Sequence, residues 1–161
     1  MGMRCEVIAI PTPQARELAA DPSGIDDLIE SLEGSANYVS LEKSWHGLHF
    51  VLTQTAWEGD PPLNFLAAGG EPVGDDDGYG PARLLRNADV RALDTALDAF
   101  TAADFDQRFD LKELEAAEIY PQIWDEPLED LKEEYGEYLA ALKGLVKRAA
   151  KADQALLIAV R

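Results

Sequence analysis

The sequence predicts an α/β protein with an α+β tendency, in which helices cover a small, largely buried β-sheet within a single domain over residues 1–161. Segments with the helical period outnumber segments with strand character. The clearest strand segments are uniformly apolar, which is typical of strands buried on both faces of a sheet. We therefore expect helices on both faces of that sheet.

The first third of the chain reads as one strand and three helices. Arg4–Ile10 is apolar and β-branched, which predicts a strand. Pro13 lies at the first position of a short helix, and Ser23 starts a capping pattern before a second helix, Ile25–Glu33. An apolar stripe of helical period then predicts a third helix over Leu41–Thr53, capped by the preceding serine.

The remaining elements follow from the same rules of period and capping. Leu63–Ala68 is predicted to be a buried strand, and Ala155–Val160 a closing strand. Between them we expect four helices: Ala88–Phe100, two short helices that begin after Thr101 and Asp110, and Leu128–Lys151. Gly69–Pro81 holds five glycines and two prolines, which predicts a loop. We expect the N- and C-terminal strands to be neighbours, since both are short and hydrophobic.

The formal net charge of −17, from 31 acidic and 14 basic residues, is spread along the whole chain. Such a field repels phosphate backbones and anionic lipid surfaces, so neither a nucleic acid nor a membrane is an expected partner. It would attract cations or a basic protein partner. Cys5 is the one cysteine in the sequence, so neither an intramolecular disulfide nor a metal site built from several cysteines can form.

The N-terminal residues lack the pattern of a secretory signal. Glu6 and Pro11 interrupt what would be its apolar stretch, and no run reaches the roughly 18 apolar residues that a membrane span requires. We therefore expect a cytoplasmic protein.

Groups with useful chemistry concentrate between Leu41 and Arg83, and a second aromatic and acidic motif follows at Ile119–Glu126. Aromatic side chains with polar edges are typical of binding clefts and interfaces. We predict a binding cleft formed by Trp45, His46, His49, Glu71, Asp75, Asp76, Asp77, Tyr79, Arg83, Tyr120 and Trp124.

Within this cleft the arginine has two interpretations. Arg83 is expected to pair with Glu71 or with one of the neighbouring aspartates, because acids are plentiful around it. The alternative is that its guanidinium holds the carboxylate of a substrate.

No complete motif implies a cofactor. His46 and His49 are three residues apart and could share a metal with Asp76, yet the His–Glu–x–x–His pattern is missing. An EF-hand aligned on Gly78 would place apolar residues at its first and last ligand positions. A tight turn, in which the aspartates accept hydrogen bonds from neighbouring N–H groups, explains the same residues. No Lys, Ser or Thr follows the glycine pair Gly69-Gly70 at the spacing of a phosphate loop.

Four separated stretches carry a resemblance to a known family: MGM at the start, SWHGLHFVLT, GGEPVGDDDGYGPAR and IYPQIW. Together they resemble the YfbM-like family of small bacterial proteins, a domain of unknown function. The resemblance spans nearly the whole chain and implies an α/β fold and a cytoplasmic bacterial protein. It brings no activity, catalytic residue or cofactor.

Two functions are consistent with these observations. The first is a non-enzymatic binding or interaction module with an acidic surface and a cleft lined by His, Asp and Trp, which would take a basic protein partner or a small-molecule ligand. The alternative is a small hydrolase-type enzyme that uses a His–carboxylate pair, with or without a divalent metal. The sequence identifies no catalytic residue for it.

Overall fold

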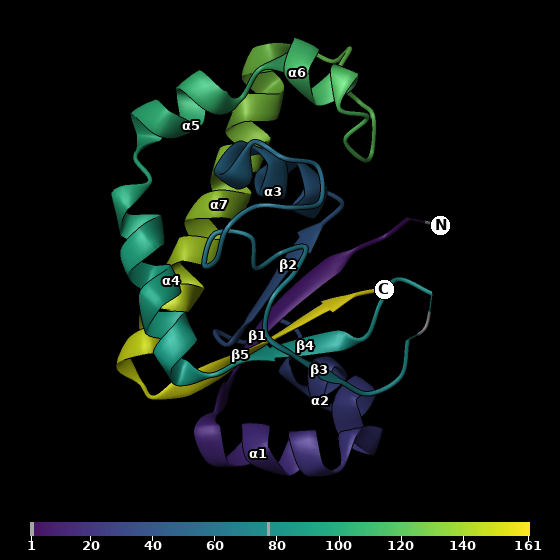
Figure 1. The fold of residues 1–161 in the computed structure, drawn as a ribbon, viewed down its shortest axis with the longest axis vertical. Coiled ribbons are helices and arrows are strands. Elements are labelled where there is room, and N and C mark those ends of the chain that lie inside the picture. The colour runs from purple at the N-terminus through teal and green to yellow at the C-terminus, as the bar shows by residue number, and fades with distance from the viewer. Residues whose placement is uncertain (1, 77) are drawn as a thin grey trace.

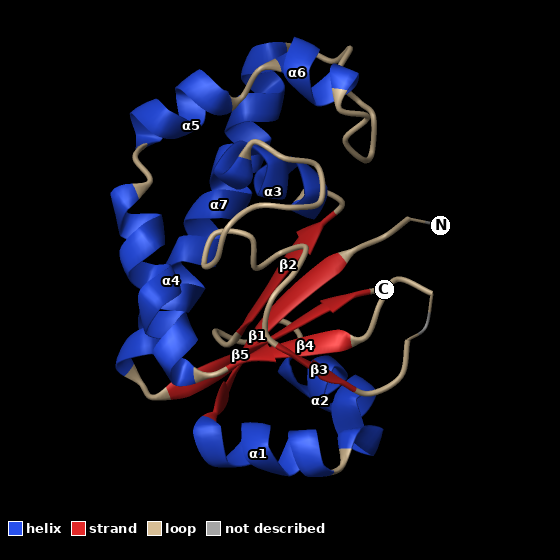
Figure 2. Cartoon of the chain, in the orientation of Figure 1, coloured by secondary structure: helices blue, strands red, loops and turns tan. Residues whose placement is uncertain are grey.

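The computed structural model describes residues 2–76 and 78–161, which form an antiparallel sheet between two layers of helices (Figures 1 and 2). Asp77, predicted to lie in the cleft, falls outside the described residues. The sheet has the strand order β2-β1-β5-β4-β3. Its strands are β1 (Cys5–Pro11), β2 (Tyr38–Glu42), β3 (Glu71–Val73), β4 (Ala82–Leu85) and β5 (Gln154–Val160).

The helices divide between the two faces of the sheet, as the sequence predicts (Figure 2). Their bounds are α1 (Thr12–Ala20), a 3₁₀ turn η1 (Pro22–Gly24), α2 (Ile25–Leu32), α3 (Trp45–Thr53), α4 (Asn87–Ala99), α5 (Ala102–Arg108), α6 (Leu111–Ala116) and α7 (Leu128–Lys151). Helices α1 and α2 cover one face, and α3, α4 and α7 lie over the other. None of the helices in the described residues combines the length and the apolar character needed to cross a bilayer.

The alternation of β5 builds two hydrophobic cores. Leu156 and Ile158 face the larger core under α3, α4 and α7, whereas Leu157 faces the smaller core under α1 and α2. All three side chains are buried, which explains why this strand reads as a continuous apolar run.

The prediction that the terminal strands are neighbours is confirmed. Strand β1 pairs with β5 antiparallel along its whole length, from Cys5 opposite Val160 to Pro11 opposite Gln154. Every strand pair in the described sheet is antiparallel.

The prediction of one helix over Leu41–Thr53 is wrong, because its start belongs to β2. Leu41 is fully buried in that strand, and the chain turns through Ser44 before α3 begins at Trp45. Pairing of β2 with β1 therefore overrides the helical period at the start of this segment. Ser40 lies within the strand and caps no helix.

Strand assignments in the middle of the chain are also corrected. Leu63–Ala68 forms turns, whereas the expected loop Gly69–Pro81 contains β3. The turn segment buries Phe65 and Leu66 in the larger core, which accounts for its apolar composition. The short β3–β4 hairpin lacks the apolar alternation that marks a strand.

Caps at the helix starts agree with the sequence in part. Thr101 forms a capping box with Asp104, and the Asp110 carboxylate accepts hydrogen bonds at the start of α6, both as predicted. The capping pattern predicted at Ser23 is wrong: Gly24 precedes α2, and no side-chain hydrogen bond caps this helix.

Candidate functional site

An aromatic stack forms at the start of α3 and is defined by Trp45, His46 and Trp57. The ring centroids of Trp45 and His46 lie 5.3 Å apart, and those of His46 and Trp57 lie 4.1 Å apart. Tyr120 flanks the stack, with its ring 6.5 Å from Trp45. The stack therefore joins α3, the segment after α3 and the Tyr120 turn.

The His46 imidazole uses both of its nitrogens to hold this arrangement. Its Nδ1 accepts a hydrogen bond from the backbone N–H of Tyr120 at 2.9 Å, so the ring proton must lie on Nε2. Nε2 donates to the Ala56 carbonyl at 2.7 Å. Burial lowers the pKa of His46, which keeps the ring neutral. Metal ligation or proton transfer by this ring would break one of the two hydrogen bonds.

His49 lies one turn further along α3 and has no exposed surface. Its Nε2 is 3.3 Å from the Thr53 hydroxyl, which itself donates to the His49 carbonyl at 2.8 Å. Nδ1 is buried and has no hydrogen-bond partner in the described residues. Desolvation by burial, reinforced by the positive charge of Arg83, lowers the pKa of His49 to about 4.

Asp75 and Asp76, the described aspartates of the Gly69–Pro81 segment, form no hydrogen bond to either histidine. Asp76 Oδ1 accepts hydrogen bonds from the backbone N–H groups of Gly78 at 2.7 Å and Gly80 at 3.0 Å, which is the tight turn described above. Asp75 lines a different hollow beside α2. In the described part of the chain, no three His, Cys, Asp or Glu side chains are arranged to hold a metal ion.

A cleft of about 220 Å³ opens beside the aromatic stack. Trp57 and Tyr79 are 57% and 50% exposed, and both line it together with Arg83. The remaining lining residues come from the turn segment, the β3–β4 hairpin, β5 and α3: Trp45, Leu66, Ala67, Gly80, Pro81, Ile158 and Val160. We call this hollow the aromatic cleft.

Arg83 anchors the wall of the aromatic cleft through backbone carbonyls. Its Nη1 donates to Gly69 O at 2.8 Å, and its Nη2 donates to Leu66 O at 3.1 Å. The expectation that Arg83 pairs with Glu71 is wrong, because Glu71 forms its ion pair with Arg86 at 3.6 Å. Burial lowers the pKa of the Arg83 guanidinium, and this side chain forms no ion pair with a carboxylate of the described residues.

The predicted cleft residues thus separate into four groups. Trp45, Tyr79 and Arg83 line the aromatic cleft, and His46 and Tyr120 support its aromatic stack. His49 is internal to the fold. Glu71, Asp75 and Trp124 lie elsewhere, and Asp76 holds the turn beside Tyr79 without lining the cleft.

Trp124 belongs mainly to the core, whereas Trp57 is the aromatic lining residue that the predicted set leaves out. The Trp124 indole donates to Ile119 O at 2.8 Å and packs edge-on against Tyr135. The sequence does carry an indication that Trp57 is exposed. It lies outside every apolar stripe, after the end of α3, and is followed by acidic residues and a Pro-rich turn.

Comparisons with known proteins agree with this fold. The family described as "Domain of unknown function (DUF1877)" matches residues 1–159. Among solved structures, the chain is similar to YfbM from Escherichia coli, a protein of unknown function: the identity is 21%, the TM-score is 0.74, and the match covers 98% of this chain and 99% of the other. No curated protein matches the chain. The resemblance found in the sequence motifs is confirmed.

Proposed function

This chain belongs to the DUF1877 family, a domain of unknown function. From its geometry we propose that it is a non-enzymatic, cytoplasmic interaction module. We propose that its aromatic cleft binds a basic segment of a protein partner. The observation that carries the proposal is the pair Trp57 and Tyr79. Both are large, half-exposed aromatic side chains, and both line one hollow. Tryptophan and tyrosine are enriched among the residues that dominate binding energy at interfaces.

Exposed carboxylates near the aromatic pair favour a cationic partner, and the one cation in the lining of the cleft, Arg83, is engaged with the backbone carbonyls of Gly69 and Leu66. Glu58 and Asp60 follow Trp57 in the chain and are exposed, and the exposed Asp76 lies in the turn that leads to Tyr79. Lysine or arginine side chains can stack on the aromatic faces while these carboxylates neutralise their charge. The net charge of −17 would also speed the association of such a partner.

The histidine geometry supports binding over the alternative of a small hydrolase. His46 has both nitrogens engaged with backbone groups, and His49 is enclosed. A His–carboxylate pair needs both groups within hydrogen-bonding reach of a substrate. Asp75 and Asp76 form no hydrogen bond to either ring, and His46 supports the cleft by holding its aromatic stack.

The indole N–H groups allow a direct test by NMR. Trp124 Nε1 donates to Ile119 O and reports on the interior, whereas Trp45, whose Nε1 donates to Met3 O, lines the cleft beside Trp57. The exposed Trp57 reports on the aromatic cleft. When a short peptide of alternating Lys and Arg is added, we expect the Trp57 indole resonance to shift most, and a matched Glu peptide to leave it unchanged.

Variants separate the cleft from general electrostatic attraction. We expect Tyr79→Ala to weaken peptide binding about tenfold, which is the size of a typical aromatic contact at an interface. Tyr138→Ala is the matched control, because Tyr138 lies on α7 among Glu134 and Glu137, away from the cleft. Equal affinities for the two variants would overturn the proposal. An association rate that does not change between about 50 and 500 mM salt would remove the electrostatic part of it.

A further inference from the structure

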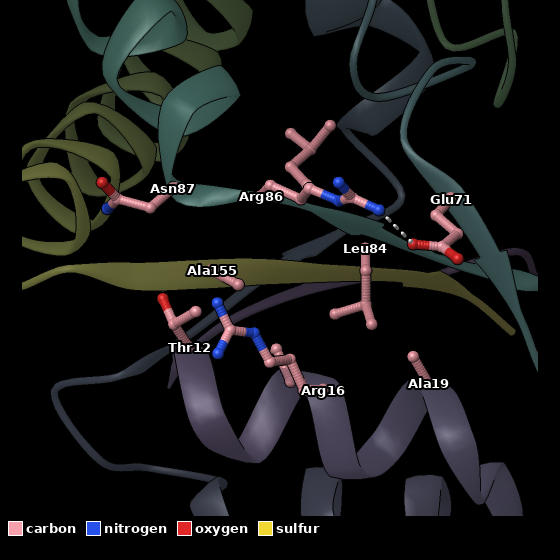
Figure 3. A pocket seen from close by; sticks show the side chains of 10 residues that line it. Thr12, Arg16, Ala19, Glu71, Leu84, Arg86, Asn87 and Ala155 are labelled. Atoms are coloured by element: carbon pink, nitrogen blue, oxygen red, sulfur yellow. Dashed lines mark ion pairs between the residues drawn. The ribbon is translucent and has the colours of Figure 1, made fainter.

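A second, larger hollow of about 390 Å³ lies between α1 and the outer part of the sheet (Figure 3). It is lined by Thr12, Ala15, Arg16, Ala19, Glu71, Leu84, Leu85, Arg86, Asn87 and Ala155. We call it the arginine hollow, after Arg16 and Arg86. We propose that it binds a small organic monocarboxylate with an apolar body. The site is separate from the aromatic cleft and does not depend on the function proposed for that cleft.

The floor of the arginine hollow is apolar because α1 does not cover the whole sheet. Helix α1 packs over β1 and β5, whereas β4 and β3 lie further out in the strand order. Leu84 of β4, Ala155 of β5 and Ala15 of α1 are each less than 9% exposed and together form the floor. The volume falls within the range of small-molecule sites, which is about 300–1,000 Å³.

Two arginines border this floor, in a protein with more than twice as many acidic as basic residues. Arg16 extends from α1 toward the strands in Figure 3, and Arg86 lies on the opposite side of the hollow. Within residues 2–76 and 78–161, Arg16 forms no ion pair. The Arg86 side chain is 81% exposed, and its Nη2 lies 3.6 Å from Glu71 Oε2. A guanidinium has five N–H donors, so one distant carboxylate leaves most of them available.

The neighbouring polar groups restrict the ligand to one negative charge. The Thr12 hydroxyl donates to Asp153 O, and the Asn87 amide donates to Ala149 O and Gln154 O, so their donors are already engaged. Recognition of a polar head therefore falls to the guanidinium groups, which match the geometry of a carboxylate. Glu71 at the rim repels a second negative charge. The apolar floor accommodates an aliphatic or flat hydrocarbon body.

Isothermal titration calorimetry with octanoate tests this assignment. We expect octanoate to bind with a stoichiometry of one, and octanol and octylamine to bind much more weakly. Arg16→Gln and Arg86→Gln should each weaken octanoate binding about tenfold, as expected for the loss of a charge-assisted hydrogen bond. Arg91→Gln is the control, because Arg91 is exposed on α4, lies outside the hollow and changes the net charge equally.

Removing the competing carboxylate should have the opposite effect. Glu71→Gln frees Arg86 and removes repulsion, so octanoate should bind several-fold more tightly. Glu129→Gln, an exposed position on α7, makes the same change of charge and should leave the affinity unchanged. A structural role for the Arg86–Glu71 pair predicts no such gain.

Filling the hollow gives an independent readout. Ala19 lines it and Ala20 does not, although both are exposed on α1. Ala19→Phe should abolish octanoate binding, whereas Ala20→Phe should retain it, and Trp57→Ala in the aromatic cleft should have no effect. The assignment is overturned if octanol binds as tightly as octanoate, if Arg16→Gln behaves like Arg91→Gln, or if Ala19→Phe still binds.

Discussion

The buried imidazole of His49 should make the stability of this protein depend on pH in the mildly acidic range. Burial lowers its pKa from 6.5 to about 4 in the folded protein. The unfolded chain therefore binds the proton more readily than the folded one between these values. Stability from the neutral ring is fully present above pH 6.5, and it falls as the pH drops toward the folded-state pKa near 4.

The size of the effect follows from the shift itself. A difference of about 2.5 pKa units, at about 1.4 kcal/mol per unit, corresponds to about 3 kcal/mol of unfolding free energy across the whole range. Between pH 7 and pH 5, the free energy of unfolding falls by about 2 kcal/mol of this total. His46 acts in the same direction, because its pKa is also lowered by burial. Carboxyl groups titrate mainly below this interval.

Urea unfolding at pH 7, 6 and 5 measures the dependence, with His49→Leu as the test variant. Leucine fills a similar volume, does not titrate and removes the buried nitrogen that lacks a partner. The Thr53 hydroxyl keeps its hydrogen bond to the backbone carbonyl of residue 49. We expect the loss of stability between pH 7 and pH 5 to shrink by about 2 kcal/mol in the variant. A variant with the same dependence on pH as the wild type would refute the reasoning.

Five further substitutions, at four positions, test the local architecture by urea unfolding. His46→Phe keeps a ring in the aromatic stack but leaves a backbone N–H and a carbonyl without partners, so we expect a loss of about 3 kcal/mol. Gly70→Ala should destabilise by more than about 1 kcal/mol, because φ is +77° and a Cβ would lie 2.8 Å from Leu84 O. Gly78→Ala, also at positive φ but with no atom within 4 Å, should cost less. Arg83→Met should lose about 1–2 kcal/mol with its two hydrogen bonds to carbonyls, and Arg83→Lys should not fully restore them. Each is contradicted if its unfolding midpoint matches the wild type.

The parts of the fold that the sequence predicts well are those whose burial is uniform. Strands β1 and β5 are covered on both faces, so apolar character alone marks them. Helix α7 repeats its apolar stripe over 24 residues, and a long period leaves little ambiguity. The short edge strand β3 has three residues and two of them are exposed, so neither composition nor alternation distinguishes it from a loop.

The candidate site was predictable in composition but not in geometry. The sequence places His46 and Tyr120 in aromatic motifs, yet their hydrogen bond joins residues 74 positions apart. Whether an imidazole faces a substrate or a peptide N–H depends on that distant contact, which no local spacing encodes. The partner of Arg83 was missed for a similar reason: backbone carbonyls accept hydrogen bonds as well as carboxylates do, and they carry no signature in the sequence.

Strand β4 explains why two hollows occur near one edge of the sheet. Neighbouring side chains of a strand point to opposite faces, so Arg83 lies on the face of the aromatic cleft and Leu84 lies on the face of the arginine hollow. The pairing of Arg83 with Ile158 and of Leu84 with Leu157 carries the same alternation into β5, whose two faces belong to different cores. The helices pack mainly over the inner strands. Side chains on both faces of β4 therefore line a hollow beside the helices. One short strand, which the sequence does not distinguish from its flanking loop, thus contributes to both candidate binding surfaces.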